Sequence, residues 1–118
     1  NEPPRFKARL VAKGFSQITG IDYNDVFSPV EKHSFIRAFF GIMAMHDLEL
    51  EQLDVKTAFL HGELEEEIYM DQPEGFVVPG KEDLVCKLNR SLYGLKQSPR
   101  QWYKRFDSFM LAHEFKRS

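Results

Sequence analysis

A single carboxylate inside a strand-like apolar run is the feature that most constrains this chain. Residues 53–62 read LDVKTAFLHG, and Asp54 stands between Leu53 and Val55. Burying an unpaired carboxylate is costly, so an acid in such a run needs a partner. A metal ion is one such partner, because hard cations prefer oxygen ligands. The alternative is an acid at a strand end that caps a turn or meets a lysine, since lone acids are weak functional signals.

Alternating apolar residues predict several short strands. Residues 6–11 alternate, and residues 48–59 predict a central strand and turn whose change of phase near Gln52 suggests a bulge. Residues 68–70 and 83–88 are expected to pair as a hairpin, because turn-forming residues separate them. The sequence therefore predicts an antiparallel sheet.

Two helices complete the expected fold. Residues 33–46 are apolar nearly all round, which predicts a buried helix. Ser98 followed by Pro99 predicts the start of a second helix. Its expected buried stripe consists of Trp102, Phe106, Phe109 and Met110. The expected fold class is α+β, an antiparallel sheet with helices packed on one side.

Length and composition indicate one small domain. The chain has 118 residues, of which 42% are hydrophobic, and no apolar run is long enough to cross a membrane. No signal-peptide pattern opens the sequence. The single cysteine, Cys86, cannot form an internal disulfide, which fits a reducing compartment. We therefore expect an intracellular rather than a secreted protein.

Charge is distributed unevenly along the chain, although the net charge is only −2. Residues 5–13 and 87–105 carry basic charges alone, whereas residues 47–83 carry 12 acids with Lys56 and Lys81. Basic ends around an acidic centre suit a cleft that holds phosphates near a metal site. They equally suit ordinary solvated surfaces, and the acid run at residues 63–67 is assigned to such a surface rather than to a metal site.

Three long strings resemble the reverse transcriptases of copia-type LTR retrotransposons. LDVKTAFLHGELEEEIYMDQPEGF is similar to the first catalytic motif and the segment that follows it. FKARLVAKGFSQITGIDYNDVFSPV extends the resemblance upstream, and LVCKLNRSLYGLKQSPRQWYKRFDSFM extends it downstream. The resemblance implies a single partial reverse transcriptase domain over residues 1–118. Residues 1–50 would be fingers-like, including the buried helix, and residues 51–118 palm-like.

Within this resemblance, Asp54 matches the first of three aspartates that hold two Mg²⁺ ions. Val55 matches a position whose backbone carbonyl also faces a metal, and Phe59 matches the bulky residue that excludes a ribose 2′-hydroxyl. The two ions activate the primer 3′-hydroxyl and neutralise the triphosphate in an in-line displacement. Without the resemblance, core packing is the simpler interpretation of Phe59.

The resemblance also implies contacts with the nucleotide and with nucleic acid. Lys7 and Arg9, with Lys13 as a third candidate, match fingers positions near the triphosphate, although basic surface residues are often only solvated. Tyr93 and Gly94 match a loop that contacts the nucleotide, where glycine allows a close approach. The expected contacts with nucleic acid are Lys96, Gln97, Ser98, Arg100 and Lys104.

The family's third motif, Tyr-x-Asp-Asp, does not occur in these 118 residues. Because two Mg²⁺ ions need more than one carboxylate, we expect the chain to be inactive alone. It would be a fragment of an RNA-directed DNA polymerase whose partners are an RNA/DNA template–primer and dNTP, in a cytoplasmic virus-like particle or the nucleus. The alternative is a domesticated or degenerate fragment that acts as a nucleic-acid or protein binding module. An exposed strand edge beside residues 53–59 would favour self-association.

Overall fold

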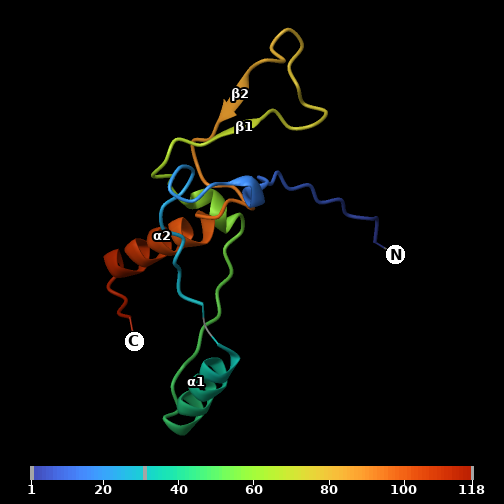
Figure 1. Ribbon diagram of the computed structural model, residues 1–118. Helices are drawn as coiled ribbons and strands as arrows, with labels where there is room; N and C mark the ends of the chain where they lie inside the picture. The colour runs from blue at the N-terminus through green and yellow to red at the C-terminus, as the bar shows by residue number, and fades with distance from the viewer. Residues whose placement is uncertain (1, 31, 118) are drawn as a thin grey trace.

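The computed structural model describes residues 2–30 and 32–117 as an open arrangement of short elements (Figure 1). In chain order the elements are η1 (Gly14–Ser16), α1 (His33–Met45), η2 (Ala58–His61), β1 (Tyr69–Asp71), β2 (Val85–Lys87) and α2 (Ser98–Ala112). Two helices and a two-stranded antiparallel sheet confirm the expected α+β class. Within the described residues, no helix is long and apolar enough to span a membrane.

The predicted hairpin is confirmed. β1 and β2 pair antiparallel with Met70 opposite Cys86. The loop between them is held by the side-chain amide of Gln72, which donates to the backbone carbonyls of Lys81 at 2.7 Å and Leu84 at 3.0 Å. The Gln72 carbonyl oxygen accepts from the backbone N–H of Val78 at 3.0 Å. One side chain therefore orders a long loop that has little secondary structure of its own.

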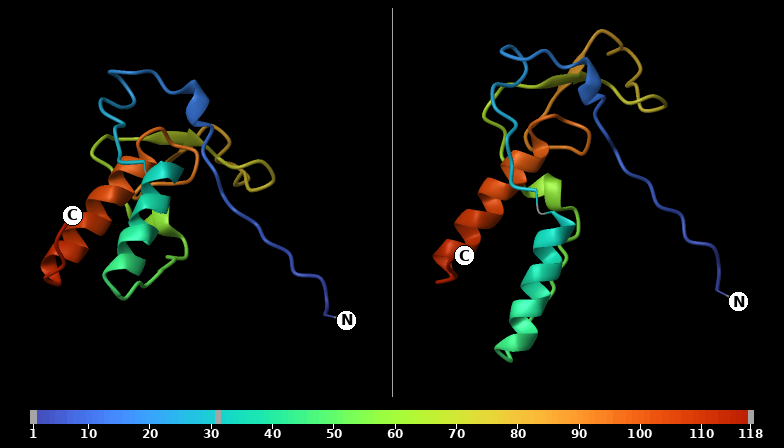
Figure 2. Two further views of the ribbon diagram at one scale, coloured as in Figure 1. Left: turned by 90° about the horizontal axis from the view of Figure 1, so that it is seen from below. Right: turned by 60° about the horizontal axis from the view of Figure 1, so that its bottom comes forward.

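α1 begins at His33 and ends at Met45, close to the predicted bounds, but the prediction that it is buried is wrong. Among its residues only Met43 is buried. Its other large apolar side chains are exposed, namely Phe35, Ile36, Phe39, Phe40, Ile42 and Met45. Two extended segments carry α1 away from the other elements (Figure 1 and the right-hand view of Figure 2). Its apolar faces therefore have no covering layer among the described residues.

The predicted central strand over residues 48–59 does not form. Residues 48–55 are irregular, residues 58–61 form η2, and Leu53 is 78% exposed. A strand needs a neighbour to satisfy its backbone groups, and the described residues offer none beside this segment. The strand edge expected to drive self-association is consequently absent from residues 2–30 and 32–117.

The N-terminal arm is also extended without a partner. The alternation of residues 6–11 predicted a strand, but only Val11 is paired, in an isolated bridge with Tyr93. Phe6 is 92% exposed. The arm therefore projects from the rest of the molecule (Figure 2).

α2 packs against η2 rather than against the hairpin. Trp102 contacts both His61, with ring centroids 6.5 Å apart, and Phe106, at 5.9 Å. The start of the helix lies within a residue of the predicted position, and Pro99 is in its first turn. The predicted buried stripe is wrong, because Phe106 and Phe109 are exposed and Trp102 and Met110 are only half-buried.

The molecule is expanded for its length. Its radius of gyration is 19.0 Å, whereas a compact domain of this length has about 13.5 Å. Its accessible surface is 10701 Å², against about 6,600 Å² for a folded monomer of this mass. The buried apolar side chains among the described residues are Met43, Ile68 and Leu95. Polar contacts and close backbone packing therefore carry much of the structure.

We predict that two matched leucine substitutions separate the small core from the open surface. Leu95 is 6% exposed, whereas Leu53 is 78% exposed. Leu95→Ala should lower the free energy of unfolding by about 2–5 kcal/mol, because it removes buried contacts and leaves a cavity. Leu53→Ala should change it by less than about 0.5 kcal/mol. Urea unfolding followed by circular dichroism measures both, and equal losses would contradict the open structure.

Candidate nucleotide and nucleic-acid interface

The N-terminal segment crosses the loop that precedes α2 at very close range. The backbone N–H of Ala12 donates to the carbonyl of Tyr93 at 2.8 Å. A Cβ atom added to Gly14 would lie 1.9 Å from the Gly94 carbonyl oxygen, and one added to Gly94 would lie 1.9 Å from that of Ala12. Gly94 also has φ +97°, a left-handed conformation that side chains disfavour. Glycine is therefore required at both positions.

This crossing brings together three residues that the sequence proposed as nucleotide contacts. The rings of Phe59 and Tyr93 lie with their centroids 4.8 Å apart at a 35° tilt. The guanidinium carbon of Arg9 lies 4.4 Å from the Tyr93 ring centroid, within cation–π range. The three side chains come from three distant parts of the chain. Together they form a stacked aromatic and cationic surface, which we call the Arg9–Tyr93–Phe59 stack.

A network of glutamine amides fixes the same crossing, and the sequence reasoning missed it. The Gln17 carbonyl oxygen accepts from the Lys96 backbone N–H at 2.7 Å, and its amide nitrogen donates to Gln97 Oε1 at 2.9 Å. Gln97 is fully buried and donates to the carbonyl of Asp22 at 3.1 Å and to Glu66 at 3.4 Å. No local pattern signals such a pair, because the two glutamines are 80 residues apart.

Two of the residues expected to contact nucleic acid are instead internal. The side chains of Gln97 and Ser98 are fully buried. The Ser98 hydroxyl donates to the carbonyl of Leu92 at 2.5 Å rather than capping α2. Both side chains are therefore enclosed by the protein itself. Lys96 remains exposed beside them.

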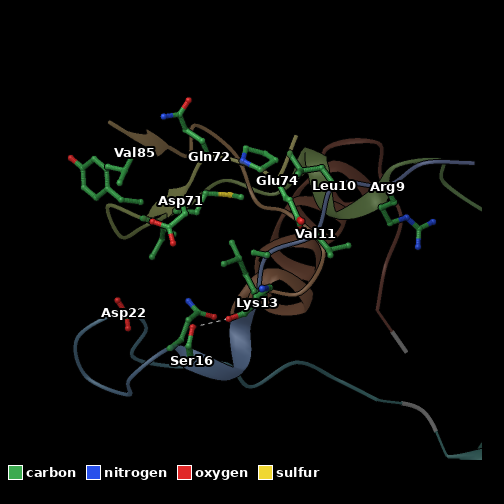
Figure 3. Close-up of a pocket in the computed structure, with 17 residues that line it drawn as sticks. Arg9, Leu10, Val11, Lys13, Ser16, Asp22, Asp71, Gln72, Glu74 and Val85 are labelled. Carbon is green, nitrogen blue, oxygen red and sulfur yellow. Dashed lines mark hydrogen bonds between the residues drawn. The ribbon is translucent and has the colours of Figure 1, made fainter. Parts of the chain in front are cut away.

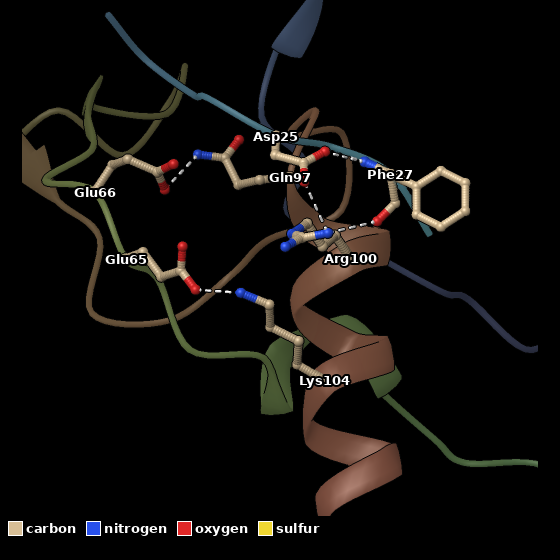
Figure 4. Close-up of polar contacts among 7 residues, drawn as sticks. All are labelled: Asp25, Phe27, Glu65, Glu66, Gln97, Arg100 and Lys104. Carbon is tan, nitrogen blue, oxygen red and sulfur yellow. Dashed lines mark hydrogen bonds and ion pairs between the residues drawn. The ribbon is translucent and has the colours of Figure 1, made fainter. Parts of the chain in front are cut away.

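The other two expected contacts, Arg100 and Lys104, are engaged in ion pairs. Arg100 pairs with Asp25 at 3.1 Å and donates to the carbonyl of Phe27 at 3.1 Å, while Lys104 pairs with Glu65 (Figure 4). Both basic side chains of α2 thus pair with acids from the connecting segments. Any phosphate that binds there must compete with these carboxylates.

Three glutamates of the acid run at residues 63–67 pair with basic residues, and all three remain largely exposed, as expected of a solvated surface. Besides Glu65, Glu63 pairs with Arg90 at 3.1 Å and Glu67 pairs with Lys87 at 2.9 Å. Hydrogen bonding to Lys104, followed by its positive charge, lowers the pKa of Glu65. Lys87 likewise lowers the pKa of Glu67, and its own pKa is raised. Alternate glutamates therefore pair this segment with β2, with Arg90 after it and with α2.

The residues matched to metal binding lie apart from the crossing in sequence and are exposed. Asp54 and Val55 belong to the irregular segment before η2. Lys7, which was expected near the triphosphate, lies on the projecting arm. Within residues 2–30 and 32–117, no group of three His, Cys, Asp or Glu side chains is close enough to hold a metal ion. A single carboxylate does not fit a two-magnesium centre, which needs further ligands.

A cleft of about 730 Å³ lies between the N-terminal segment and the hairpin (Figure 3). Its polar side chains include Arg9 and Lys13 from one wall, and Asp71 and Glu74 from the other. Of the residues expected near the nucleotide, Arg9 and Lys13 line it, whereas Lys7, Phe59, Tyr93 and Gly94 do not. The cleft therefore shares Arg9 with the Arg9–Tyr93–Phe59 stack but does not include its two rings.

Comparison with known proteins identifies the family. The model of the family described as reverse transcriptase (RNA-dependent DNA polymerase) matches residues 2–118. The chain belongs to the reverse transcriptase family. It is 66% identical over 111 residues to the retrovirus-related Pol polyprotein from transposon TNT 1-94 of Nicotiana tabacum, which is 94% of this chain and 8% of that protein.

Two Arabidopsis thaliana proteins are also similar over 94% of this reverse transcriptase chain. They are the retrovirus-related Pol polyproteins from transposons RE2, at 48% identity, and RE1, at 47%. The chain spans about 8% of the length of each of these relatives. No solved structure gives a significant match.

We predict that Gly94→Ala disrupts the crossing. The added Cβ would collide with the Ala12 carbonyl and hold a strained φ, so the free energy of unfolding should fall by more than about 2 kcal/mol. Gly80→Ala is the matched control, because Gly80 has φ +81° with nothing within 4 Å of the added atom. It should cost only about 1–2 kcal/mol, the strain alone. Equal urea midpoints for the two variants would argue against a close crossing.

We also predict that the Glu65–Lys104 pair responds to acid. Because the pKa of Glu65 is lowered in the folded chain, the pair stabilises at pH values above the unfolded pKa, about 4.3. The stabilisation that the pair provides is lost as the pH falls through the lower pKa of Glu65 in the folded chain. Carboxyl NMR titration should show the pKa of Glu65 rising toward its ordinary value in Lys104→Met. An unchanged pKa in this variant would exclude Lys104 as the cause.

Proposed function

We propose that this chain is the fingers–palm part of an RNA-directed DNA polymerase encoded by a copia-type retrotransposon. The Arg9–Tyr93–Phe59 stack carries the proposal, because three residues chosen for nucleotide contact converge from separate segments. The similarity to transposon Pol polyproteins supports the same function. The polymerase would act inside the cell, in a virus-like particle or the nucleus.

In this proposal, the stack receives the incoming nucleotide. Arg9 is exposed and presents a forked set of donors that suits the oxygens of a triphosphate. Phe59 lies under the sugar and selects deoxynucleotides by a clash with a 2′-hydroxyl. Tyr93 supports both side chains, and Gly94 lets the backbone approach the nucleotide. Lys7 on the extended arm would reach the same phosphates only when the arm folds back.

The metal part of the proposed site is incomplete within residues 1–118. Asp54 and the backbone carbonyl of Val55 would supply ligands to Mg²⁺, which in the whole polymerase would activate the primer hydroxyl and neutralise the triphosphate. Further carboxylates would have to come from elsewhere in the polymerase. We expect the 118-residue chain alone to show no primer extension, and metal-dependent extension by the purified chain would contradict this.

Lys96, Arg100 and Lys104 form the proposed contact with template–primer. Lys96 is exposed, whereas Arg100 and Lys104 are paired with Asp25 and Glu65. A phosphate backbone would replace these carboxylates as the partner of each basic side chain. Nucleic-acid binding should therefore be weakened by the acids and strengthened when one of them is neutralised.

Titration of a labelled primer–template duplex tests this contact. The wild-type chain should bind with an affinity that falls with salt, and Arg100→Ala/Lys104→Ala should reduce the slope of log K against log salt by about 1.8, the loss of two phosphate contacts. Glu65→Gln should bind more tightly, because Lys104 loses its competitor. Lys56→Ala/Lys81→Ala removes the same charge elsewhere and should retain more of the slope.

The outcomes decide whether these basic residues form a nucleic-acid surface. Salt-dependent binding that follows this order supports a polymerase fragment with a working nucleic-acid surface. Equal loss of slope in both double variants would indicate attraction by net charge alone. Absence of binding by a folded chain would overturn the proposed contact.

A further inference from the structure

We infer that Gln17 is a positioning residue of the nucleotide site, whose side-chain amide holds Arg9 over Tyr93. The inference rests on the proposed function of the Arg9–Tyr93–Phe59 stack. Gln17 itself touches neither Arg9 nor Tyr93 in the hydrogen-bond network; it acts through the loop at residues 93–97. It lies within the upstream string of the resemblance, which assigns it no role.

The first step of the argument is the direction of the hydrogen bonds. The backbone N–H of Lys96 can only donate, and the backbone carbonyl of Asp22 can only accept. Between these fixed ends, Gln17 accepts from Lys96 and donates to Gln97, and Gln97 donates to Asp22. Neither amide can be turned round without facing oxygen to oxygen or nitrogen to nitrogen. The network therefore has one orientation.

The second step is burial. Gln97 is fully buried and Gln17 is half-buried, so water does not readily replace a lost partner of Gln97. Loss of the Gln17 donor would leave Gln97 Oε1 without the partner that the structure gives it. An unsatisfied buried polar atom costs more than the hydrogen bond itself contributes. The loop would shift to relieve it.

The third step is geometry. The two segments touch at the Gly14 and Gly94 backbones, and they are joined on one side of this contact by Ala12 and Tyr93. Gln17 joins them on the other side, through Lys96 and Gln97. Attachment at one point would let the segments rotate about the contact, whereas attachment on both sides prevents it.

The fourth step links Gln17 to Arg9. The short η1 turn lies between Gly14 and Gln17, and the Gln17 N–H donates to the Gly14 carbonyl at 3.1 Å. Ser16 closes the same turn by donating to Lys13 at 2.9 Å. This compact turn transmits the position of Gln17 to the crossing, from which Arg9 extends over the Tyr93 ring. Release of Gln17 should therefore loosen the stack while leaving its three side chains intact.

The first experiment observes the stack directly by NMR in the 118-residue chain. The side-chain protons of Arg9 should be shifted upfield, because the guanidinium lies over the Tyr93 ring. Gln17→Leu removes both polar groups of the amide. Gln17→Glu keeps the size of the side chain and the acceptor for Lys96, but it loses the donor to Gln97. Both variants should lose most of the upfield shift.

Gln72→Leu is the matched control. Gln72 also bridges backbone groups through its side-chain amide, but it orders the hairpin loop and has no bond to the 93–97 loop. It should keep the Arg9 shift. Retention of the shift in both Gln17 variants, or its absence from the wild-type chain, would overturn the inference. Loss of all dispersed signals in both Gln17 variants would also overturn it, since Gln17 would then determine folding rather than position.

The second experiment measures nucleotide use by the complete polymerase polypeptide that contains these residues. Gln17→Glu should raise KM for dNTP about tenfold and leave kcat within about twofold, because a loosened stack weakens nucleotide binding without altering the reacting groups. Gln72→Leu should change neither constant. A fall in kcat alone would contradict the assignment of Gln17 to nucleotide positioning.

The two experiments separate the inference from the function on which it rests. Arg9→Ala in the polymerase tests the stack itself, and an unchanged KM for dNTP in that variant would overturn the proposed nucleotide site. The NMR result would still decide whether Gln17 positions Arg9.

Discussion

The contact between the backbones of Gly14 and Gly94 is the constraint on which the ordered part of the molecule depends. It leaves no room for a Cβ atom on either side. Because the segments approach so closely, Ala12 can reach the Tyr93 carbonyl and Gln17 can reach the 93–97 loop. An expanded chain with few buried apolar side chains thus gains a fixed point between residues that are 80 positions apart in sequence. The aromatic and cationic stack is built on this point.

Electrostatic pairing extends order outward from the crossing. Three glutamates of residues 63–67 meet basic residues of β2, of the segment after it and of α2, and Asp25 ties the N-terminal half to Arg100. These pairs are partly or largely exposed, so each contributes little to stability alone. Their larger effect is to occupy the basic side chains. Any phosphate that bound to these residues would therefore compete with the carboxylates of the segment for the same charges.

Sequence patterns correctly predicted those elements whose position is determined by short-range interactions. The bounds of α1, the hairpin and the start of α2 follow from periodicity, turn residues and Pro99, all of which act within a few positions. The predictions of a central strand and of a buried α1 were wrong, because an apolar pattern indicates only that a segment must be covered or paired. It does not supply the neighbouring strand or layer. The glutamine pair escaped prediction for the same reason, since nothing near Gln17 indicates Gln97. Arg9, Tyr93 and Phe59 were predicted as nucleotide contacts from a family resemblance rather than from periodicity.

This difference divides the proposed site into two parts with different physical requirements. The nucleotide-facing part is assembled by a backbone crossing, a buried amide network and ring contacts, all within the described residues. The metal-facing part depends on Asp54. This residue lies in a segment whose apolar alternation predicts a strand, and a strand needs neighbouring strands for pairing. A carboxylate can be held in line with a metal only when its backbone is held, and an unpaired segment does not hold it. In the proposed site, nucleotide contact would therefore be separable from metal binding, and pairing of residues 48–55 with a further strand is the step that would join them.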